Sequence, residues 1–166
     1  MMNNHVRALA CVMGLALGAC AGAPAKASGP TLMFFVGAEC PVSNSYAPDI
    51  QRIGDDWAAR GGIVWLVYAE PGLTVETASA HAERFGLNGT IILDVNRSLA
   101  AAHGVTRLPT AVVPDVYRGR IDDRFSPEGK RRDVPRTRDL EDALTALASG
   151  RAPAVRETPV FGCPLP

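Results

Sequence analysis

The sequence lacks an excess of charge of either sign, has few aromatic side chains, and contains no internal repeat. Its 166 residues include 17 Lys and Arg against 17 Asp and Glu, and aromatic residues make up 6% of the chain. This balance of charge argues against nucleic-acid binding through a broad basic surface. Hydrophobic residues at 47% and charged residues at 20% indicate one globular domain rather than a disordered chain.

Acidic residues are absent from the start of the chain, where the sequence has the features of an export signal. Arg7 supplies a positive charge, and the apolar run at 8–17 is too short to cross a bilayer. The run leads into Leu-Gly-Ala-Cys, ending at Cys20. This motif resembles the bacterial lipoprotein box, in which Cys20 would be lipidated and become the mature N-terminus. The alternative is ordinary cleavage after Ala27.

The lipoprotein interpretation divides the chain into four parts. These are a signal peptide at 1–19, a flexible tether at 20–30, a folded domain at 31–150, and a proline-rich, mobile-looking tail at 151–166. Acyl chains would hold the protein on a membrane surface. The residue after Cys20 is Ala21 and not an acidic residue. This pattern resembles that of lipoproteins sorted to the outer membrane. We therefore expect a protein of the cell envelope that faces the periplasm.

The four cysteines reduce to two in the mature protein. Cys11 would leave with the signal peptide and Cys20 would carry lipid, so Cys40 and Cys163 remain. Outside the cytosol, two such thiols can form a disulfide or cycle through one. Three roles stay open for Cys163. It resolves an oxidised Cys40, it is a structural thiol, or it pairs between chains.

Apolar runs alternate with helical periods and predict the order β-α-β-α-β-α-β-β-α. The expected strands lie at 31–36, 63–68, 91–95, 110–113 and 117–121, the last two forming an antiparallel hairpin. The expected helices lie at about 42–60, 74–85, 98–103 and 137–149, the last of them capped by Thr137. This alternation predicts an α/β fold with a central mixed sheet and helices on both faces.

Cys40 lies where the first predicted strand is followed by the first long helix. The unpaired N–H groups of a helix N-terminus favour a thiolate and lower the thiol pKa. A thiolate is the nucleophile in disulfide exchange and in attack on peroxide. The position therefore predicts a reactive thiol, with a buried structural cysteine as the alternative.

Two further residues are expected beside the Cys40 sulfur. Ser43 stands where the second cysteine of a CxxC motif would be, and its hydroxyl would donate a hydrogen bond to the thiolate or simply suit the first helical turn. Pro109 precedes the strand at 110–113. A cis bond there would expose backbone groups beside the sulfur, whereas a trans loop proline is the simpler alternative.

Four segments together resemble the thioredoxin-like redoxins, in the branch of alkyl hydroperoxide reductases and thiol-specific antioxidant proteins. They are TLMFFVGAECPVSNSYAP at 31–48, GVTRLPTAVV at 104–113, YRGRIDD at 117–123 and ETPVFGCPLP at 157–166. The resemblance implies a thioredoxin-like three-layer sandwich, a redox role for Cys40, and a cis bond between Leu108 and Pro109.

Two departures from the family pattern concern the chemistry. Ser43 removes the second cysteine of thioredoxins, and Gly37 stands where typical peroxiredoxins have a threonine before the reactive cysteine. Arg107 and Arg120 are candidates for the family's peroxide-orienting arginine.

The resulting prediction is a thiol-disulfide oxidoreductase or thiol peroxidase that uses Cys40, with Ser43, Pro109 and Cys163 as further site residues. Its partners would be a protein or small-molecule disulfide or a peroxide, and an external thiol reductant, with no bound cofactor or metal. The alternatives are a non-catalytic thioredoxin-fold binding protein and a metallochaperone.

Overall fold

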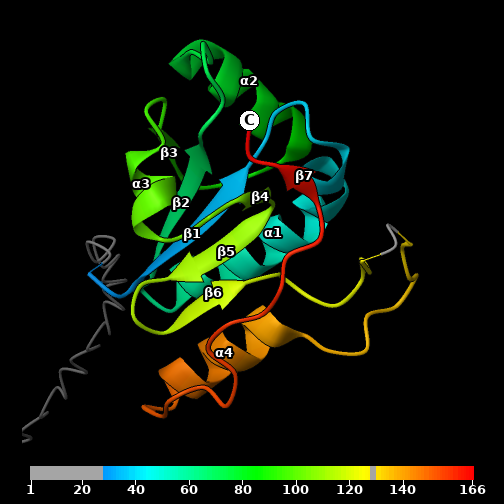
Figure 1. The fold of residues 1–166 in the computed structure, drawn as a ribbon. Helices are drawn as coiled ribbons and strands as arrows, with labels where there is room; N and C mark the ends of the chain where they lie inside the picture. The colour runs from blue at the N-terminus through cyan, green and yellow to red at the C-terminus, as the bar shows by residue number, and fades with distance from the viewer. Residues whose placement is uncertain (1–27, 128–129) are drawn as a thin grey trace, which may run out of the picture.

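A five-stranded mixed sheet forms the centre of the protein (Figure 1). The computed structural model describes residues 28–127 and 130–166. The strand order is β3-β2-β1-β5-β6, with β1 at Thr31–Val36, β2 at Ile63–Tyr68, β3 at Thr90–Leu93, β5 at Thr110–Val113 and β6 at Tyr117–Gly119. The predicted signal peptide, the predicted lipidation site at Cys20 and most of the predicted tether lie outside the described residues.

Strand β1 occupies the middle of the sheet and leads directly into the candidate site. It pairs in parallel with β2 from Thr31 opposite Ile63 to Val36 opposite Tyr68, and antiparallel with β5 on its other side. Its apolar run is buried on both faces of the sheet, which explains why the run is continuous rather than alternating.

Helices cover both faces of the sheet, as the sequence predicts. Helices α1 (Pro41–Ala59), α2 (Val75–Phe85) and α4 (Asp139–Ala148) contribute to the larger apolar cluster. Helix α3 (Ser98–Ala102) contributes to a smaller cluster on the opposite face. The result is a thioredoxin-like α/β sandwich. No helix within the described residues is long and apolar enough to cross a membrane.

The predicted helix caps are correct in part, and the predicted hairpin is correct. Thr74 caps α2, and the hairpin of β5 and β6 is antiparallel, both as expected. Thr137 was expected to cap α4, but the N-cap is Arg138. The prediction fails because the Thr137 hydroxyl donates instead to the carboxylate of Asp139, at 2.8 Å.

The C-terminal tail is paired with the domain along much of its length, although its composition suggests mobility. The N–H of Thr158 donates to the carbonyl oxygen of Arg118 at 3.1 Å. Further along, the two-residue strand β7 (Cys163–Pro164) pairs antiparallel with the two-residue strand β4 (Arg107–Leu108). Figure 1 shows this last segment returning across the sheet to the start of α1.

The buried hydroxyl of Thr158 anchors the tail before it reaches the site. It lies 2.7 Å from the Tyr117 hydroxyl and accepts the N–H of Arg120 at 3.1 Å. We expect Thr158→Val to lower the free energy of unfolding by about 1–3 kcal/mol, because the partly buried N–H of Arg120 then loses its acceptor. Urea denaturation measures the change. The control is Thr145→Val, which alters an exposed threonine of α4, and equal losses in both variants would contradict the anchoring role.

Candidate functional site

Cys40 occupies the N-cap of α1, at the strand-to-helix junction that the sequence predicts. Its backbone is extended, with φ −84° and ψ 110°, and Pro41 follows within the first turn. The Cys40 sulfur accepts the N–H of Ser43 at 3.3 Å. One donor at the start of the helix therefore points at the sulfur, and the helix dipole favours negative charge there.

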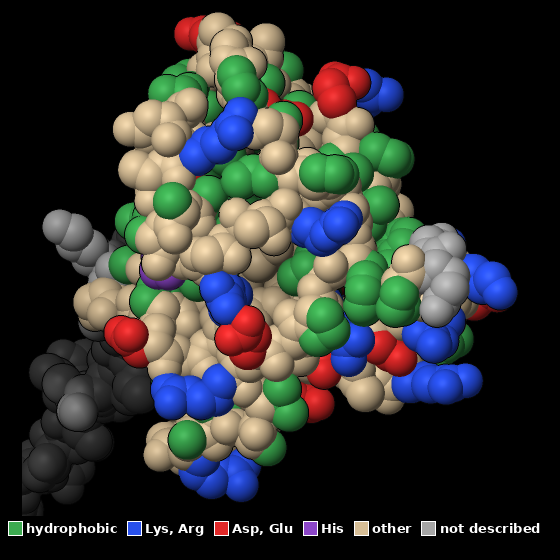
Figure 2. Space-filling view, viewed as in Figure 1, with side chains coloured by type: hydrophobic (Ala, Val, Ile, Leu, Met, Phe, Trp, Pro, Cys, Tyr) green, Lys and Arg blue, Asp and Glu red, His purple; other side chains and the backbone are tan. Residues whose placement is uncertain are grey.

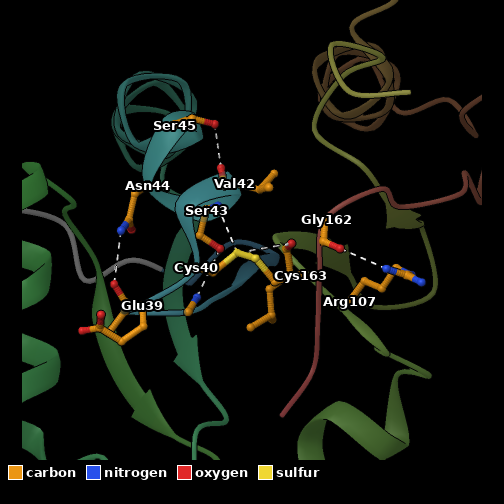
Figure 3. Close-up of a disulfide and its surroundings, with 12 residues drawn as sticks. Glu39, Cys40, Val42, Ser43, Asn44, Ser45, Arg107, Gly162 and Cys163 are labelled. Atoms are coloured by element: carbon orange, nitrogen blue, oxygen red, sulfur yellow. Dashed lines mark hydrogen bonds between the residues drawn. A yellow bond between two sulfur atoms is a disulfide. The ribbon is translucent and has the colours of Figure 1, made fainter. Parts of the chain in front are cut away.

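A disulfide joins Cys40 to Cys163 across 123 residues of sequence, with the two Cα atoms 6.1 Å apart (Figure 3). Cys163 therefore pairs within one chain and not between chains. This pairing is compatible with a resolving role and with a structural one. Cys163 reaches this position because it belongs to β7, opposite Leu108 of β4.

The cis proline lies beside the same sulfur. The bond between Leu108 and Pro109 is cis, as the family resemblance implies. The carbonyl oxygen of Leu108 lies 3.8 Å from the Cys40 sulfur. A Cβ added at Gly162 would lie 2.0 Å from this carbonyl oxygen, so only glycine lets the tail approach so closely. The start of α1, the cis-proline strand and the tail therefore converge on the disulfide.

Ser43 holds the loop before Cys40. Its hydroxyl accepts the N–H of Gly37 at 3.2 Å, while the backbone N–H of Ser43 donates to the Cys40 sulfur. Ser43 is 2% exposed, and the Gly37 N–H needs an acceptor in this buried position. Donation from the Ser43 hydroxyl to a Cys40 thiolate stays a prediction for the reduced protein, because the structure holds the disulfide.

Two polar residues that sequence reasoning missed also hold this loop. A Glu70 carboxylate oxygen accepts the N–H of Ala38 at 2.9 Å. The Asn44 side-chain amide donates to the Ala38 carbonyl oxygen at 3.2 Å. Glu70 follows closely after β2, the parallel neighbour of the strand that leads to Cys40. A polar residue after a neighbouring buried strand was the available signal, because parallel strands end at one edge of a sheet.

His81 extends this network into the layer between α2 and β2. Its Nδ1 lies 2.8 Å from the Tyr68 hydroxyl, and its Nε2 lies 2.9 Å from the side-chain oxygen of Asn44. Asn44 presents its oxygen to His81, so Nε2 carries the proton and Nδ1 accepts from Tyr68. Burial lowers the His81 pKa below its usual value, and the charges of Glu70 and Glu39 oppose that shift. A neutral His81 thus positions the amide that holds the loop.

The two candidate arginines lie in different surroundings. Arg107 donates to the carbonyl oxygen of Gly162 at 3.0 Å, beside the disulfide (Figure 3). Arg120 forms an ion pair with Asp139 at 2.8 Å. The Arg107 side chain therefore contacts the residue next to Cys163, whereas Arg120 meets the tail through its backbone N–H, at Thr158.

A hollow of about 370 Å³ adjoins the disulfide. Its lining is mainly apolar with one cation, and includes Val42, Arg107, Phe125, Val160, Phe161 and Gly162. Its volume lies within the range of small-molecule sites.

Figure 2 shows Lys and Arg side chains interspersed with acidic and hydrophobic ones on one face of the protein, not gathered into a single broad patch. In the described part of the chain, no group of three or more His, Cys, Asp or Glu residues could hold a metal ion.

Comparison with known proteins finds relatives in fold. No protein-family model matches the chain, and no curated protein sequence matches it. A hypothetical protein from Sinorhizobium meliloti 1021 is 25% identical, with a TM-score of 0.72 over 84% of this chain and 80% of that chain. An uncharacterized conserved protein from Geobacillus kaustophilus is 23% identical, with a TM-score of 0.70 over 84% and 78%. A secreted Mycobacterium tuberculosis disulfide oxidoreductase homologous to E. coli DsbE is 17% identical, with a TM-score of 0.48 over 70% and 81%.

The lowered pKa of His81 makes a prediction about stability and pH. An unfolded histidine binds a proton as the pH falls below 6.5, its ordinary pKa, whereas folded His81 resists protonation. Stability is therefore complete above that pH and is lost as the pH falls toward the folded pKa. We expect His81→Gln to remove this part of the decline, and to cost about 1–3 kcal/mol at pH 7.5 because buried partners are disturbed.

Urea denaturation at pH 7.5 and pH 5.5 measures both effects. His103→Gln is the control, because it removes a histidine at the C-cap of α3 on the opposite face of the sheet. If His81→Gln and the wild type lose the same stability over this range, His81 is not the group responsible.

Proposed function

We propose that the protein is a thiol-dependent redox protein in which Cys40 and Cys163 form the reactive pair. The observation that carries the proposal is the Cys40 sulfur at a helix N-cap, bonded to a segment paired with the cis-proline strand. This arrangement brings together a Cys40 sulfur that a helix N-terminus would stabilise as a thiolate, a second sulfur that can bond to it, and a strand edge that pairs with an extended segment of polypeptide. It supports exchange of disulfides without a bound cofactor.

The environment of Cys40 contains opposing influences on its thiol. A hydrogen bond from the Ser43 N–H to a thiolate contributes about 1.5–3 kcal/mol, and the dipole of α1 contributes up to about 2 kcal/mol. Burial opposes ionisation, because Cys40 is 5% exposed. Part of that burial comes from Cys163 itself, whose hold on Cys40 ends on reduction. In the reduced protein we expect the charge-stabilising influences to dominate.

The proposed cycle starts from the reduced pair. The Cys40 thiolate attacks one sulfur of a substrate disulfide, forms a mixed disulfide and expels the other sulfur as a thiolate. The Cys163 thiolate then attacks the Cys40 sulfur and expels the second substrate thiolate. This step produces the disulfide of the structure, and two electrons have passed to the substrate. External thiols restore the reduced pair.

Peroxide is the second substrate to test. The Cys40 thiolate would attack the peroxide oxygen to give a sulfenic acid, and the departing oxygen would take a proton to leave as water or an alcohol. Cys163 would then displace water from Cys40. A disulfide substrate is favoured, because Gly37 replaces the family's threonine.

One observation favours a rival function, a non-catalytic binding protein with a structural disulfide. Cys40 lies among buried apolar residues that include Phe35 and Leu108. A bond that closes a loop of 123 residues stabilises a fold by about 5 kcal/mol in the chain-entropy account. Structural bonds of this kind have reduction potentials below about −300 mV.

Alkylation of the reduced protein distinguishes the two functions. We expect Cys40 to reach half its maximal alkylation rate below about pH 7.5, as thiols at helix N-termini do. We expect reduction of a small disulfide by the wild type and none by Cys40→Ser. A matched assay with hydrogen peroxide separates the two substrates.

The rival would be favoured by an ordinary Cys40 titration together with no turnover of either substrate. A potential below about −300 mV in a dithiol redox buffer would support the same conclusion.

We also propose that the protein is exported and anchored in the cell envelope, with the division at 19/20 that the sequence predicts. Lipid on Cys20 supplies the anchor, and the residues up to 30 supply the tether. The support is the apolar run and the motif that ends at Cys20. The thioredoxin-like domain then faces an oxidising compartment, where a disulfide between Cys40 and Cys163 persists.

A single substitution tests the anchor in a bacterial host that expresses the full chain. We expect Cys20→Ala to move the protein from the detergent-rich phase to the aqueous phase after detergent partitioning, because the acyl chains are lost. Cys11→Ala is the control and should leave partitioning unchanged. A mature N-terminus at Ser28 in the wild type would show ordinary cleavage instead.

A further inference from the structure

We propose that external thiols enter the oxidised protein at the Cys163 sulfur and not at Cys40. We further propose that the hollow beside Cys163 holds the body of an incoming thiol with an apolar group and a carboxylate. The inference rests on the proposed function and concerns the step that reduces the disulfide again.

Accessibility favours attack at Cys163. Cys40 is 5% exposed and belongs to the apolar cluster on the face of α3. Cys163 is half-buried, and Pro164 and Pro166 beside it are exposed. Thiol-disulfide exchange requires contact with the attacked sulfur. The residue nearer the surface therefore presents the more reachable one.

The leaving group favours the same choice. Attack at Cys163 expels Cys40 as a thiolate, which the Ser43 N–H and the N-terminus of α1 stabilise. Attack at Cys40 would expel Cys163, for which the described residues provide no hydrogen-bond donor comparable to Ser43. A thiol with a lower pKa leaves faster. The accessibility of the Cys163 sulfur and the stability of the departing Cys40 thiolate thus both favour attack at Cys163.

The step balances with two external thiols. The first thiolate forms a bond with the Cys163 sulfur, and the bond between the two protein sulfurs breaks as Cys40 departs with its electron pair. The second thiolate attacks the external sulfur of the mixed disulfide and expels the Cys163 thiolate. The two external thiols are oxidised to one disulfide, and the protein disulfide is reduced.

The hollow indicates the chemistry of the incoming thiol. It extends from Gly162, the neighbour of Cys163, to Val42 in the first turns of α1, and Phe161 contributes to its apolar lining. Arg107 supplies the cation, and it takes part in no ion pair among the described residues. An apolar group can therefore fill the hollow while a carboxylate meets Arg107. A small thiol acid and a cysteine-containing acidic peptide share this chemistry.

Mass spectrometry of a trapped intermediate tests the point of entry. The oxidised full chain is mixed briefly with acetyl-Phe-Cys and quenched with an alkylating agent. Trypsin then separates the Cys40 peptide at 27–52 from the Cys163 peptide at 157–166. We expect the external thiol on Cys163 and the alkyl group on Cys40. The reverse pattern would overturn the inference while leaving the proposed redox function intact.

No reduction by any thiol would instead reject the proposed function itself, and the inference with it.

Matched probes test the hollow. We expect acetyl-Phe-Cys to reduce the protein about tenfold faster than acetyl-Ala-Cys, because it buries an apolar ring. We expect the free acid to react about two- to fivefold faster than its carboxamide, because an ion pair forms with the exposed Arg107. Arg107→Gln should abolish the preference for the acid, and Arg107→Lys should keep most of it.

Equal rates for all probes, corrected for thiol pKa, would show that the hollow is not used. A longer peptide with the same Phe-Cys centre distinguishes the two sources of the incoming thiol, a small thiol acid and a polypeptide. A faster rate identifies a polypeptide and a slower rate identifies a small thiol.

Discussion

The bond between Cys40 and Cys163 is the constraint on which the geometry of the site depends. The disulfide ties the segment around Cys163 to the start of α1. The pairing of β7 with β4 in the same segment covers only two residues on each strand. Such a short pairing is weak by itself, since isolated two-stranded ribbons are marginal in water. The covalent bond therefore keeps the tail on the cis-proline strand, and its loss would weaken that contact.

The loop before Cys40 has a support that is separate from the disulfide. Glu70 and Asn44 hold this loop, and His81 in turn holds Asn44. These residues lie just after β2, in α1 and in α2, and none of them belongs to the tail. Under the proposed function, we expect this support to hold the loop and the helix N-cap in both oxidation states. Exchange chemistry benefits from one preorganised sulfur and one movable partner.

The two faces of the sheet serve different purposes. Helices α1, α2 and α4 pack against the face with the larger apolar cluster, which includes Phe34 and Trp57. The other face is covered by the short helix α3 and by the region of β4 and β7, where Cys40 and Leu108 are buried together. A five-residue helix leaves room on that face for the returning tail. The asymmetry of the layers therefore determines where a second sulfur can approach the first.

The sequence by itself determined the five strands of the central sheet, the four helices and the place of Cys40 at a strand-to-helix junction, but not the short strands β4 and β7. The strands 31–36 and 63–68 follow from continuous apolar runs, and Pro41 marks the start of a helix just after Cys40. These features are local, because periodicity and helix-start signals act within a few residues. The cis bond before Pro109 came from the family resemblance, which carries information about tertiary contacts.

Only the tertiary structure decided how distant groups meet. Whether Cys163 pairs with Cys40 depends on a Cα separation that sequence spacing does not contain. The Ser43 hydroxyl accepts from Gly37, a contact that no local pattern indicates. The Thr137 hydroxyl donates to Asp139 and does not cap the helix, because a nearby carboxylate competes for it. Glu70 and His81 serve the site through contacts made by packing. The place of Glu70 after a buried strand is visible in the sequence, but the residues that Glu70 and His81 contact are not.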